Sequence, residues 1–236
     1  KDAEHENRRR LRQGKRLVEP LYTRTDAEKA MRQFQTLEYD TERQFLPGVR
    51  LRLRDAGHIL GSAIVELWLE ENGNRRKIVF SGDLGHADAP ILRDPEAVQE
   101  ADLVVLESTY GDREHRPWDE TIAELGEVFR EAARDEGNIL IPAFAIGRSQ
   151  ELLYFLKHHH REWGIDQWTV FLDSPMAIEA TAVYGRHWKL FDAEASGRRK
   201  KDGDPFSMPN LHFSRTAAQS MAINRVRSGA IVIAGS

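Results

Sequence analysis

Apolar and charged residues alternate along the chain between residues 49 and 54. Positions 49, 51 and 53 carry Val, Leu and Leu, and positions 50, 52 and 54 carry Arg. A period of two is typical of a strand with one buried face. Two further apolar runs, at 64–69 and 77–80, flank the sequence Glu-Asn-Gly-Asn, whose Asn-Gly pair favours a tight hairpin. We therefore expect an antiparallel sheet in this part of the chain.

The second half of the chain has a different rhythm, in which continuous apolar runs alternate with helical patterns. The apolar runs lie at 103–106, 139–144, 169–172, 211–213 and 230–234. The helical patterns lie near 118–135, near 149–160, after Pro175 and before Ile231. Strands that alternate with helices imply parallel strands joined by right-handed crossovers. The segment 192–209 is rich in Gly, Lys and Asp, and we expect it to be an exposed loop.

The start of the chain is predicted to be helical. Residues 1 to about 16 are expected to form a charged helix. Thr25 and Glu28 have the spacing of a capping box and predict a second helix through about Gln35.

The change from an antiparallel to an alternating strand–helix pattern places a lobe boundary near residues 110–120. The predicted fold class is α/β, with one lobe at 1–115 and a second at 116–236.

Composition narrows the classes of function. With 236 residues and 40% hydrophobic content, the chain can bury a sizeable core. No segment approaches the ~20 apolar residues of a membrane span or resembles a signal peptide, so we expect a soluble, cytoplasmic protein without a membrane partner. Cysteine is absent, which leaves His, Asp and Glu as metal ligands. The net charge of −4 argues against a wholly basic nucleic-acid wrapper, although basic residues cluster at 8–10 and 198–201.

Three of the predicted strands end in polar residues that can carry chemistry. Asp-Ala-Gly-His-Ile-Leu-Gly-Ser-Ala at 55–63 presents His58 in a glycine-containing loop. Ser-Gly-Asp-Leu-Gly at 81–85 contains Asp83, whose two carboxylate oxygens can bridge two divalent cations. Glu-Ser-Thr-Tyr-Gly at 107–111 begins with Glu107, which can accept the N–H of a histidine and orient it for proton transfer.

Each of these three residues also has an ordinary structural interpretation. A lone residue such as His58 is more often a structural histidine than a metal ligand. Asp83 can close a turn before a glycine, and Glu107 can be a helix cap or a solvated acid. Three polar strand ends in succession favour a shared site over three unrelated turns.

The motifs at 55–63, 81–85 and 107–111 resemble, in order and in spacing, successive motifs of the β-CASP branch of the metallo-β-lactamase superfamily. Its members are RNA-processing nucleases related to the messenger-RNA 3′-end cleavage endonuclease. Pro-Ala-Phe-Ala-Ile-Gly-Arg-Ser-Gln-Glu at 142–151 and Asp-Ser-Pro-Met-Ala at 173–177 resemble sequences of the β-CASP insertion itself. The resemblance implies part of a metallo-β-lactamase αββα sandwich at 1–115 and a β-CASP lobe, with a parallel sheet flanked by helices, at 116–236.

The resemblance also implies roles for individual residues. The histidine matching His58 is a zinc ligand, the aspartate matching Asp83 bridges two zinc ions, and the acid matching Glu107 orients a catalytic histidine. The implied function is a zinc-dependent ribonuclease, endonucleolytic or 5′-to-3′ exonucleolytic, with RNA as its partner between the two lobes. Whether the protein is a homodimer stays open. Two cations ~3.5–4 Å apart can hold a hydroxide nucleophile and neutralise the charge on the phosphate.

Arg148 is the expected phosphate contact. It follows a predicted strand and begins a helix, where backbone N–H groups attract phosphate and the guanidinium can add a bidentate contact. The alternative is an interior arginine paired with an acid. Ser149 and, in the next strand-end turn, Ser174 are further expected substrate contacts. We interpret His158–His160 as a solvated helix end, because adjacent helical residues point ~100° apart and cannot converge on one ion.

The sequence departs from the family pattern in the metal motif. A His-x-His-x-Asp-His motif should precede these residues, yet nothing in residues 1–50 matches it, and the family's later histidines would follow residue 236. His58 and Asp83 alone are fewer ligands than a tight binuclear site requires, so this chain alone is expected to bind zinc weakly and not to cleave RNA. Because it also begins at Lys1 and stops after an apolar run, we interpret the chain as a fragment of an active enzyme.

Two other functions compete with a ribonuclease. One is a degenerate member that serves as a non-catalytic RNA-binding or assembly subunit, although a scaffold has no chemical reason to keep His58, Asp83 and Glu107. The other is a metallo-hydrolase acting on a small ester or thioester, which the motifs of the second lobe disfavour.

Overall fold

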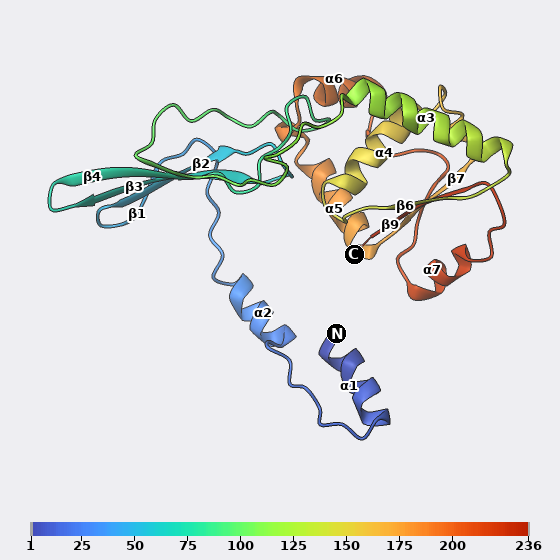
Figure 1. Ribbon diagram of the computed structural model, residues 1–236, viewed down its shortest axis with the longest axis horizontal. Helices are drawn as coiled ribbons and strands as arrows, with labels where there is room; N and C mark the ends of the chain where they lie inside the picture. The colour runs from blue at the N-terminus through green and yellow to red at the C-terminus, as the bar shows by residue number, and fades with distance from the viewer. Residues whose placement is uncertain (1, 236) are drawn as a thin grey trace. The chain divides into compact units, whose positions relative to one another are not determined.

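The computed structural model describes residues 2–235, and the chain divides into two compact units between Glu38 and Tyr39. The first unit holds helices α1 (Asp2–Arg12) and α2 (Arg24–Met31), both drawn in blue in Figure 1. Both helices are shorter than predicted. None of the residues of α2 is buried, so packing does not extend this helix.

The predicted capping box at the start of α2 is wrong by two residues. Thr23 has the extended backbone of an N-cap, and its side chain accepts a hydrogen bond from the backbone N–H of Asp26 at 3.3 Å. The Asp26 carboxylate accepts the Thr23 N–H at 2.8 Å in return. Thr25 lies inside the helix, and Glu28 pairs with Arg24 instead. Both pairs have capping-box spacing, so spacing alone could not separate them.

The second unit contains two sheets. The first has the order β1 (Arg43–Leu46), β2 (Val49–Asp55), β3 (Ala63–Glu71), β4 (Asn74–Phe80) and β5 (Leu103–Val105). Strands β1 to β4 are antiparallel, and β5 runs parallel to β4. The predicted hairpin between β3 and β4 is confirmed, and its Asn72 and Gly73 have positive φ angles of 51° and 75°, as a type I′ turn requires.

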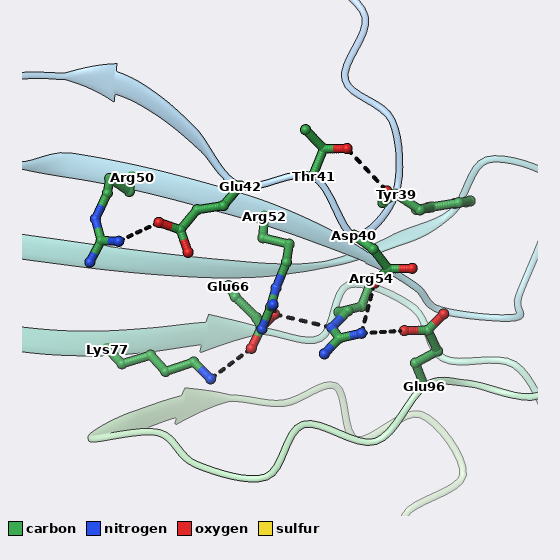
Figure 2. A network of polar contacts seen from close by, with 10 residues as sticks. All are labelled: Tyr39, Asp40, Thr41, Glu42, Arg50, Arg52, Arg54, Glu66, Lys77 and Glu96. Atoms are coloured by element: carbon green, nitrogen blue, oxygen red, sulfur yellow. Dashed lines mark hydrogen bonds and ion pairs between the residues drawn. The ribbon is translucent and has the colours of Figure 1, made fainter.

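The charged face of the first sheet is organised around Glu66 of β3, whose side chain is 1% exposed. Figure 2 shows it between two arginines of β2 and a lysine of β4. Arg52 Nε and Lys77 Nζ each lie 2.6 Å from a Glu66 oxygen, and Arg54 Nε lies at 3.3 Å. Arg54 also reaches Glu96 at 2.9 Å. Two of the three arginines that alternate along β2, Arg52 and Arg54, therefore bind a buried carboxylate rather than facing only water.

The second sheet has the order β6 (Ile139–Pro142), β9 (Ala230–Ala234), β7 (Thr169–Asp173) and β8 (Leu211–Phe213), and every pair is parallel. The predicted parallel sheet is confirmed. Figure 1 shows α3 (Trp118–Arg134), α4 (Arg148–His158) and α5 (Pro175–Arg186) on one side of it and α7 (Ala217–Ile223) on the other. Two short 3₁₀ helices, Ile165–Gln167 and Trp188–Leu190, lie in the connections.

A large apolar core surrounds the second sheet. Its fully buried members come from helices and strands alike, and they include Phe129, Leu153, Leu172, Ile231 and Ile233. Ile91, from the segment after β4, is 1% exposed and belongs to the same core. The core around the first sheet is much smaller and consists of Ala56, Ile64 and Val79 with two partly buried neighbours.

Two predictions for the second half need correction. The expected loop at 192–209 contains helix α6 (Ala193–Asp202), because Asp192 caps it by accepting the Ala195 N–H at 2.6 Å and Ala195 is fully buried. The segment is otherwise polar, so its composition did not indicate that Ala195 is buried. His158 does end α4, but His159 is not solvated: its ring stacks on Trp163 at 4.4 Å, and 14% of its side chain is exposed.

The predicted α/β class is confirmed. An antiparallel-rich sheet is followed by an all-parallel sheet flanked by helices, which is consistent with part of a metallo-β-lactamase sandwich and a β-CASP lobe. The predicted division at residue 115 lies inside the second unit, between β5 and α3, and stays a prediction.

Candidate active site

Three strands of the first sheet deliver the candidate residues to one edge. Both β2 and β4 are antiparallel to β3, so they run in the same direction, and β5 is parallel to β4. The carboxyl ends of β2, β4 and β5 therefore meet at one edge of the sheet. His58, Asp83 and Glu107 follow these ends within three residues. The topology brings together the three residues that the sequence singled out.

The loops that carry His58 and Asp83 are in direct backbone contact. The Gly85 N–H donates to the carbonyl oxygen of Ala56 at 2.8 Å. A Cβ on Gly85 would lie 2.0 Å from the carbonyl oxygen of Gly57 and 2.9 Å from the nitrogen of His58. Only glycine allows so close an approach, so the Gly85 of the Ser-Gly-Asp-Leu-Gly motif fixes the spacing of the two loops.

Glu107 is joined to the loop that carries Asp83. Its carboxylate accepts the backbone N–H of Leu84 at 2.6 Å, and its own N–H donates to the hydroxyl of Ser81 at 3.0 Å. The Leu84 N–H is the largest influence that holds the pKa of Glu107 below its usual value, and Thr109 and His58 lower that pKa further. Glu107 is therefore ionised at neutral pH and can accept a hydrogen bond from a histidine.

His58 and Asp83 have the properties of metal ligands without a complete site. Both are exposed, and within residues 2–235 neither the His58 ring nor the Asp83 carboxylate forms a hydrogen bond or ion pair. An imidazole and a carboxylate suit zinc. Among the residues that the structure describes, however, no group of three or more His, Asp or Glu side chains could hold a metal ion. These residues fit two positions of a zinc centre, and other ligands would have to complete it.

Arg148 is the first residue of α4, and its side chain is 55% exposed. Its guanidinium lies 2.5 Å from the carboxylate of Glu151, one helical turn later. Burial raises the pKa of Glu151, while Arg148 and His58 act to lower it. The loop of His58 lies against the start of α4, because a Cβ on Gly147 would come within 2.9 Å of Ile59 Cγ2.

The expectation that backbone N–H groups at the start of α4 are open to phosphate is wrong. The Gly147 N–H donates to the side-chain oxygen of Gln150 at 2.8 Å. The Arg148 N–H donates to the carbonyl of Ile146 and the Ser149 N–H to that of Phe144, both at 3.2 Å. The tight turn before the helix uses these donors itself, so a phosphate contact here depends on the Arg148 side chain.

The hydroxyls of Ser149 and Ser174 have partners within the protein. Ser149 is 1% exposed and donates to the carbonyl of Phe144 at 2.8 Å. Ser174 is 3% exposed and caps α5 by accepting the Ala177 N–H at 3.2 Å. Their predicted contact with substrate stays a prediction, and both bonds give these serines a role in shaping the turns.

Three residues near the candidate site were not singled out from the sequence. Asp55 is 8% exposed and accepts the Gly57 N–H at 2.9 Å, which braces the loop of His58. Glu151 stands at the end of the motif at 142–151, which could have indicated it. Tyr184 of α5 contacts the same loop, because its hydroxyl accepts the backbone N–H of Leu60. Nothing in the sequence beyond helical periodicity indicates this residue.

The family match covers three of the four strands of the second sheet. The family described as "Beta-Casp domain" matches residues 149–236, which include α4 except its first residue, α5 and the strands β7 to β9. The chain contains a β-CASP domain. Two motifs resemble the β-CASP insertion. The motif at 142–151 overlaps the start of this match, and the motif at 173–177 lies within it.

Similar proteins occur in bacteria and archaea. The chain is 37% identical over 219 residues to Ribonuclease TTHA0252 of Thermus thermophilus, covering 92% of this chain and 49% of that protein. It is 32% identical over 222 residues to Transcription termination factor FttA of Pyrococcus abyssi, covering 92% and 34%. It is 34% identical over 166 residues to an RNase J-like protein of Methanocaldococcus jannaschii, covering 69% and 38%. The β-CASP chain thus spans half or less of the length of these relatives.

No helix in the described part of the β-CASP chain combines the length and the apolar character that crossing a membrane requires.

Proposed function

We propose that this β-CASP chain is part of a zinc-dependent ribonuclease that hydrolyses RNA phosphodiester bonds in the cytoplasm. The observation that carries the proposal is the meeting of His58, Asp83 and Glu107 at one edge of the first sheet, with Ile59 of the His58 loop against Gly147, the residue before Arg148. The 37% identity to a bacterial ribonuclease supports RNA as the substrate. The remaining metal ligands would come from other residues of the full-length protein.

In this proposal His58 and Asp83 would hold zinc together with those other ligands. Bound zinc would make a water molecule nucleophilic near neutral pH and would neutralise charge on the phosphate. Glu107 stays ionised because the Leu84 N–H lowers its pKa, and it accepts the N–H of a histidine that protonates the leaving oxygen. The close contact between the loops at Gly57 and Gly85 fixes the distance between His58 and Asp83.

Arg148 binds the RNA phosphate in this proposal after it exchanges partners. In the structure its guanidinium pairs with Glu151, whose side chain is 19% exposed. A phosphate can replace or share this interaction, because the exposed guanidinium has five N–H donors and the Glu151 contact is made by Nη1. The pairing with Glu151 holds the arginine beside the site when RNA is absent.

The metal part of the proposal is tested by analysing the full-length protein for zinc and assaying cleavage of a labelled RNA before and after chelation. We expect bound zinc, loss of cleavage on chelation and recovery on adding zinc. Zinc-free protein that cleaves RNA would overturn the mechanism. Protein that binds RNA without cleaving it, with or without zinc, would favour the non-catalytic RNA-binding or assembly subunit.

The RNA contact is tested with Arg148→Ala, with Arg215→Ala as a matched control. Arg215 lies in the same lobe, is 56% exposed and also pairs with an acid, Glu179, at 2.9 Å. We expect Arg148→Ala to weaken RNA binding about ten-fold and to reduce the slope of log affinity against log salt by about one. Equal RNA affinities for the two variants would show that Arg148 does not contact RNA.

A second candidate function is transcription termination, which the 32% identity to the Pyrococcus abyssi termination factor favours. It uses the same candidate site, so the two functions differ in context and not in chemistry. An in vitro transcription assay with the full-length protein distinguishes them: shortened transcripts that are released from stalled polymerase would support termination, and cleavage of only free RNA would support the ribonuclease.

A further inference from the structure

The loop that carries His58 is attached to the second lobe by two contacts. The backbone N–H of Leu60 donates to the hydroxyl of Tyr184 in α5 at 3.1 Å. The side chain of Ile59 lies against Gly147, the residue before α4, so closely that a Cβ on Gly147 would approach Ile59 Cγ2 to 2.9 Å. The two residues that follow His58 are thus in contact with α5 and with the residue that precedes Arg148 at the start of α4.

The rest of the His58 loop is held mainly by its own residues. The Ser62 hydroxyl accepts the N–H groups of His58 and Ile59 at 3.1 and 3.3 Å. The Ser62 N–H donates back to the carbonyl of Ile59 at 2.9 Å. Across residues 58–61 of the described chain, the Tyr184 hydroxyl provides the one hydrogen bond that comes from outside the loop.

Tyr184 is itself rigidly placed. It is 2% exposed, and its ring lies 6.1 Å from that of Phe206 and 6.5 Å from that of Phe191, both of which are also 2% exposed. A buried aromatic side chain in such a core has little freedom to move. Its hydroxyl therefore gives the backbone of Leu60 a fixed point in the second lobe.

We propose that Tyr184 is a positioning residue, which fixes the backbone after His58 and so aligns the imidazole with Asp83 and with Arg148. This inference rests on the proposed function, because it assumes that His58 is a zinc ligand. Partners that orient a metal-binding histidine change metal affinity when they are lost, even though they do not touch the metal. The second lobe would then contribute to the metal centre as well as to the binding of RNA.

The test compares Tyr184→Phe with Tyr154→Phe in the full-length protein. Tyr154 of α4 is a matched control: it is 5% exposed in the same core, and its hydroxyl interacts with Arg198 rather than with the His58 loop. Zinc retention is measured by competition with a chelator, and cleavage of labelled RNA gives kcat and KM separately. We expect Tyr184→Phe to retain zinc about ten-fold less tightly and to lower kcat with KM within about two-fold, while Tyr154→Phe matches wild type.

Hydrogen exchange provides a second readout that needs neither zinc nor RNA. Tyr184→Phe should speed amide exchange in the peptide covering 55–63, and Tyr154→Phe should not. Equal zinc retention and equal exchange in the two variants would overturn the role of Tyr184. Wild-type protein that retains zinc but does not cut RNA would overturn the proposed function alone, and the zinc comparison would still decide on Tyr184.

Discussion

The two sheets of the second unit are stabilised by different interactions. The parallel sheet β6-β9-β7-β8 is surrounded by a large apolar core, in which residues such as Leu172 and Ile233 are fully buried. The sheet β1-β2-β3-β4-β5 has a much smaller apolar core and instead surrounds the buried Glu66 with three cations. Ion pairs thus connect the strands of the sheet whose ends carry the candidate metal ligands. Apolar packing stabilises the sheet that is covered by α4, the helix of Arg148.

Because of this difference, the alternation of apolar and charged residues gives an incomplete prediction for the first sheet. An alternation of apolar residues and arginines along β2 predicts one buried and one solvated face. Instead, Arg52 and Arg54 are 25% and 27% exposed and bind Glu66. A charged position in a strand is therefore not always a solvated one, because a buried partner on the next strand can satisfy it.

The largest expected effect is loss of stability in the apolar sheet. Leu172→Ala on β7 removes a fully buried side chain and should lower the free energy of unfolding by about 3 kcal/mol. Leu140→Ala on β6 is the matched control, because Leu140 is 70% exposed and should change it by less than about 0.5 kcal/mol. Urea denaturation measures both. Similar midpoints for the two variants would contradict the assignment of the core.

The next largest effect tests the charged sheet. Burial alone would raise the pKa of Glu66, but hydrogen bonds from Arg52 and Lys77 outweigh it and lower the pKa from 4.5 to about 2. Glu66→Gln should therefore cost about 2–3 kcal/mol of unfolding free energy at pH 7. Glu70→Gln on the same strand should cost less than about 0.5 kcal/mol, because the Glu70–Arg75 pair is exposed.

The pH dependence of the same variant follows from the direction of this pKa shift. A carboxylate with a lowered pKa contributes stability above its unfolded value of 4.5 and loses that contribution as the pH falls toward about 2. Wild-type protein should lose this stability between pH 4.5 and 2, and Glu66→Gln should lack that part of the loss. Parallel stability curves for the two proteins over this range would show that Glu66 is not the buried anion of the sheet.

The smallest effect concerns Trp68 of β3, which shares cations with Glu66. Arg52 and Lys77 each lie 5.2 Å from the centre of its ring. Trp68→Leu should cost about 1 kcal/mol in cation–π energy. Combined with Glu66→Gln, it should cost less than the sum of the single changes, because both variants release the same cations. Strict additivity in a double-mutant cycle would show that the two residues act independently.

Much of the fold could be predicted from the sequence, and the failures have local causes. The hairpin at Asn72 and Gly73 and the parallel strands follow from strong local signals. Helix α6 was missed because one buried residue, Ala195, anchors an otherwise polar segment. The cap of α2 was misplaced because two pairs have the same spacing.

Only those parts of the candidate site that lie within short sequence motifs could be predicted. His58, Asp83 and Glu107 stand in motifs at strand ends, so their types and spacing indicate them. The contact of Leu60 with Tyr184 joins residues 124 positions apart, and no periodic pattern encodes it. The internal use of the N–H groups before α4 depends on the shape of one turn, which the sequence does not specify.

If the loop ends of the first sheet form a metal-dependent catalytic site, removing the Asp83 carboxylate should abolish most of the RNA cleavage. Single-turnover cleavage of a labelled RNA is compared for full-length wild type, Asp83→Ala and Asp166→Ala, where Asp166 is an exposed carboxylate at the start of a 3₁₀ helix in the second lobe. We expect a loss of at least about 100-fold for Asp83→Ala, since losing even an indirect partner of a metal ligand costs 10–100-fold, and no loss for Asp166→Ala. Undiminished cleavage by Asp83→Ala would contradict this catalytic site.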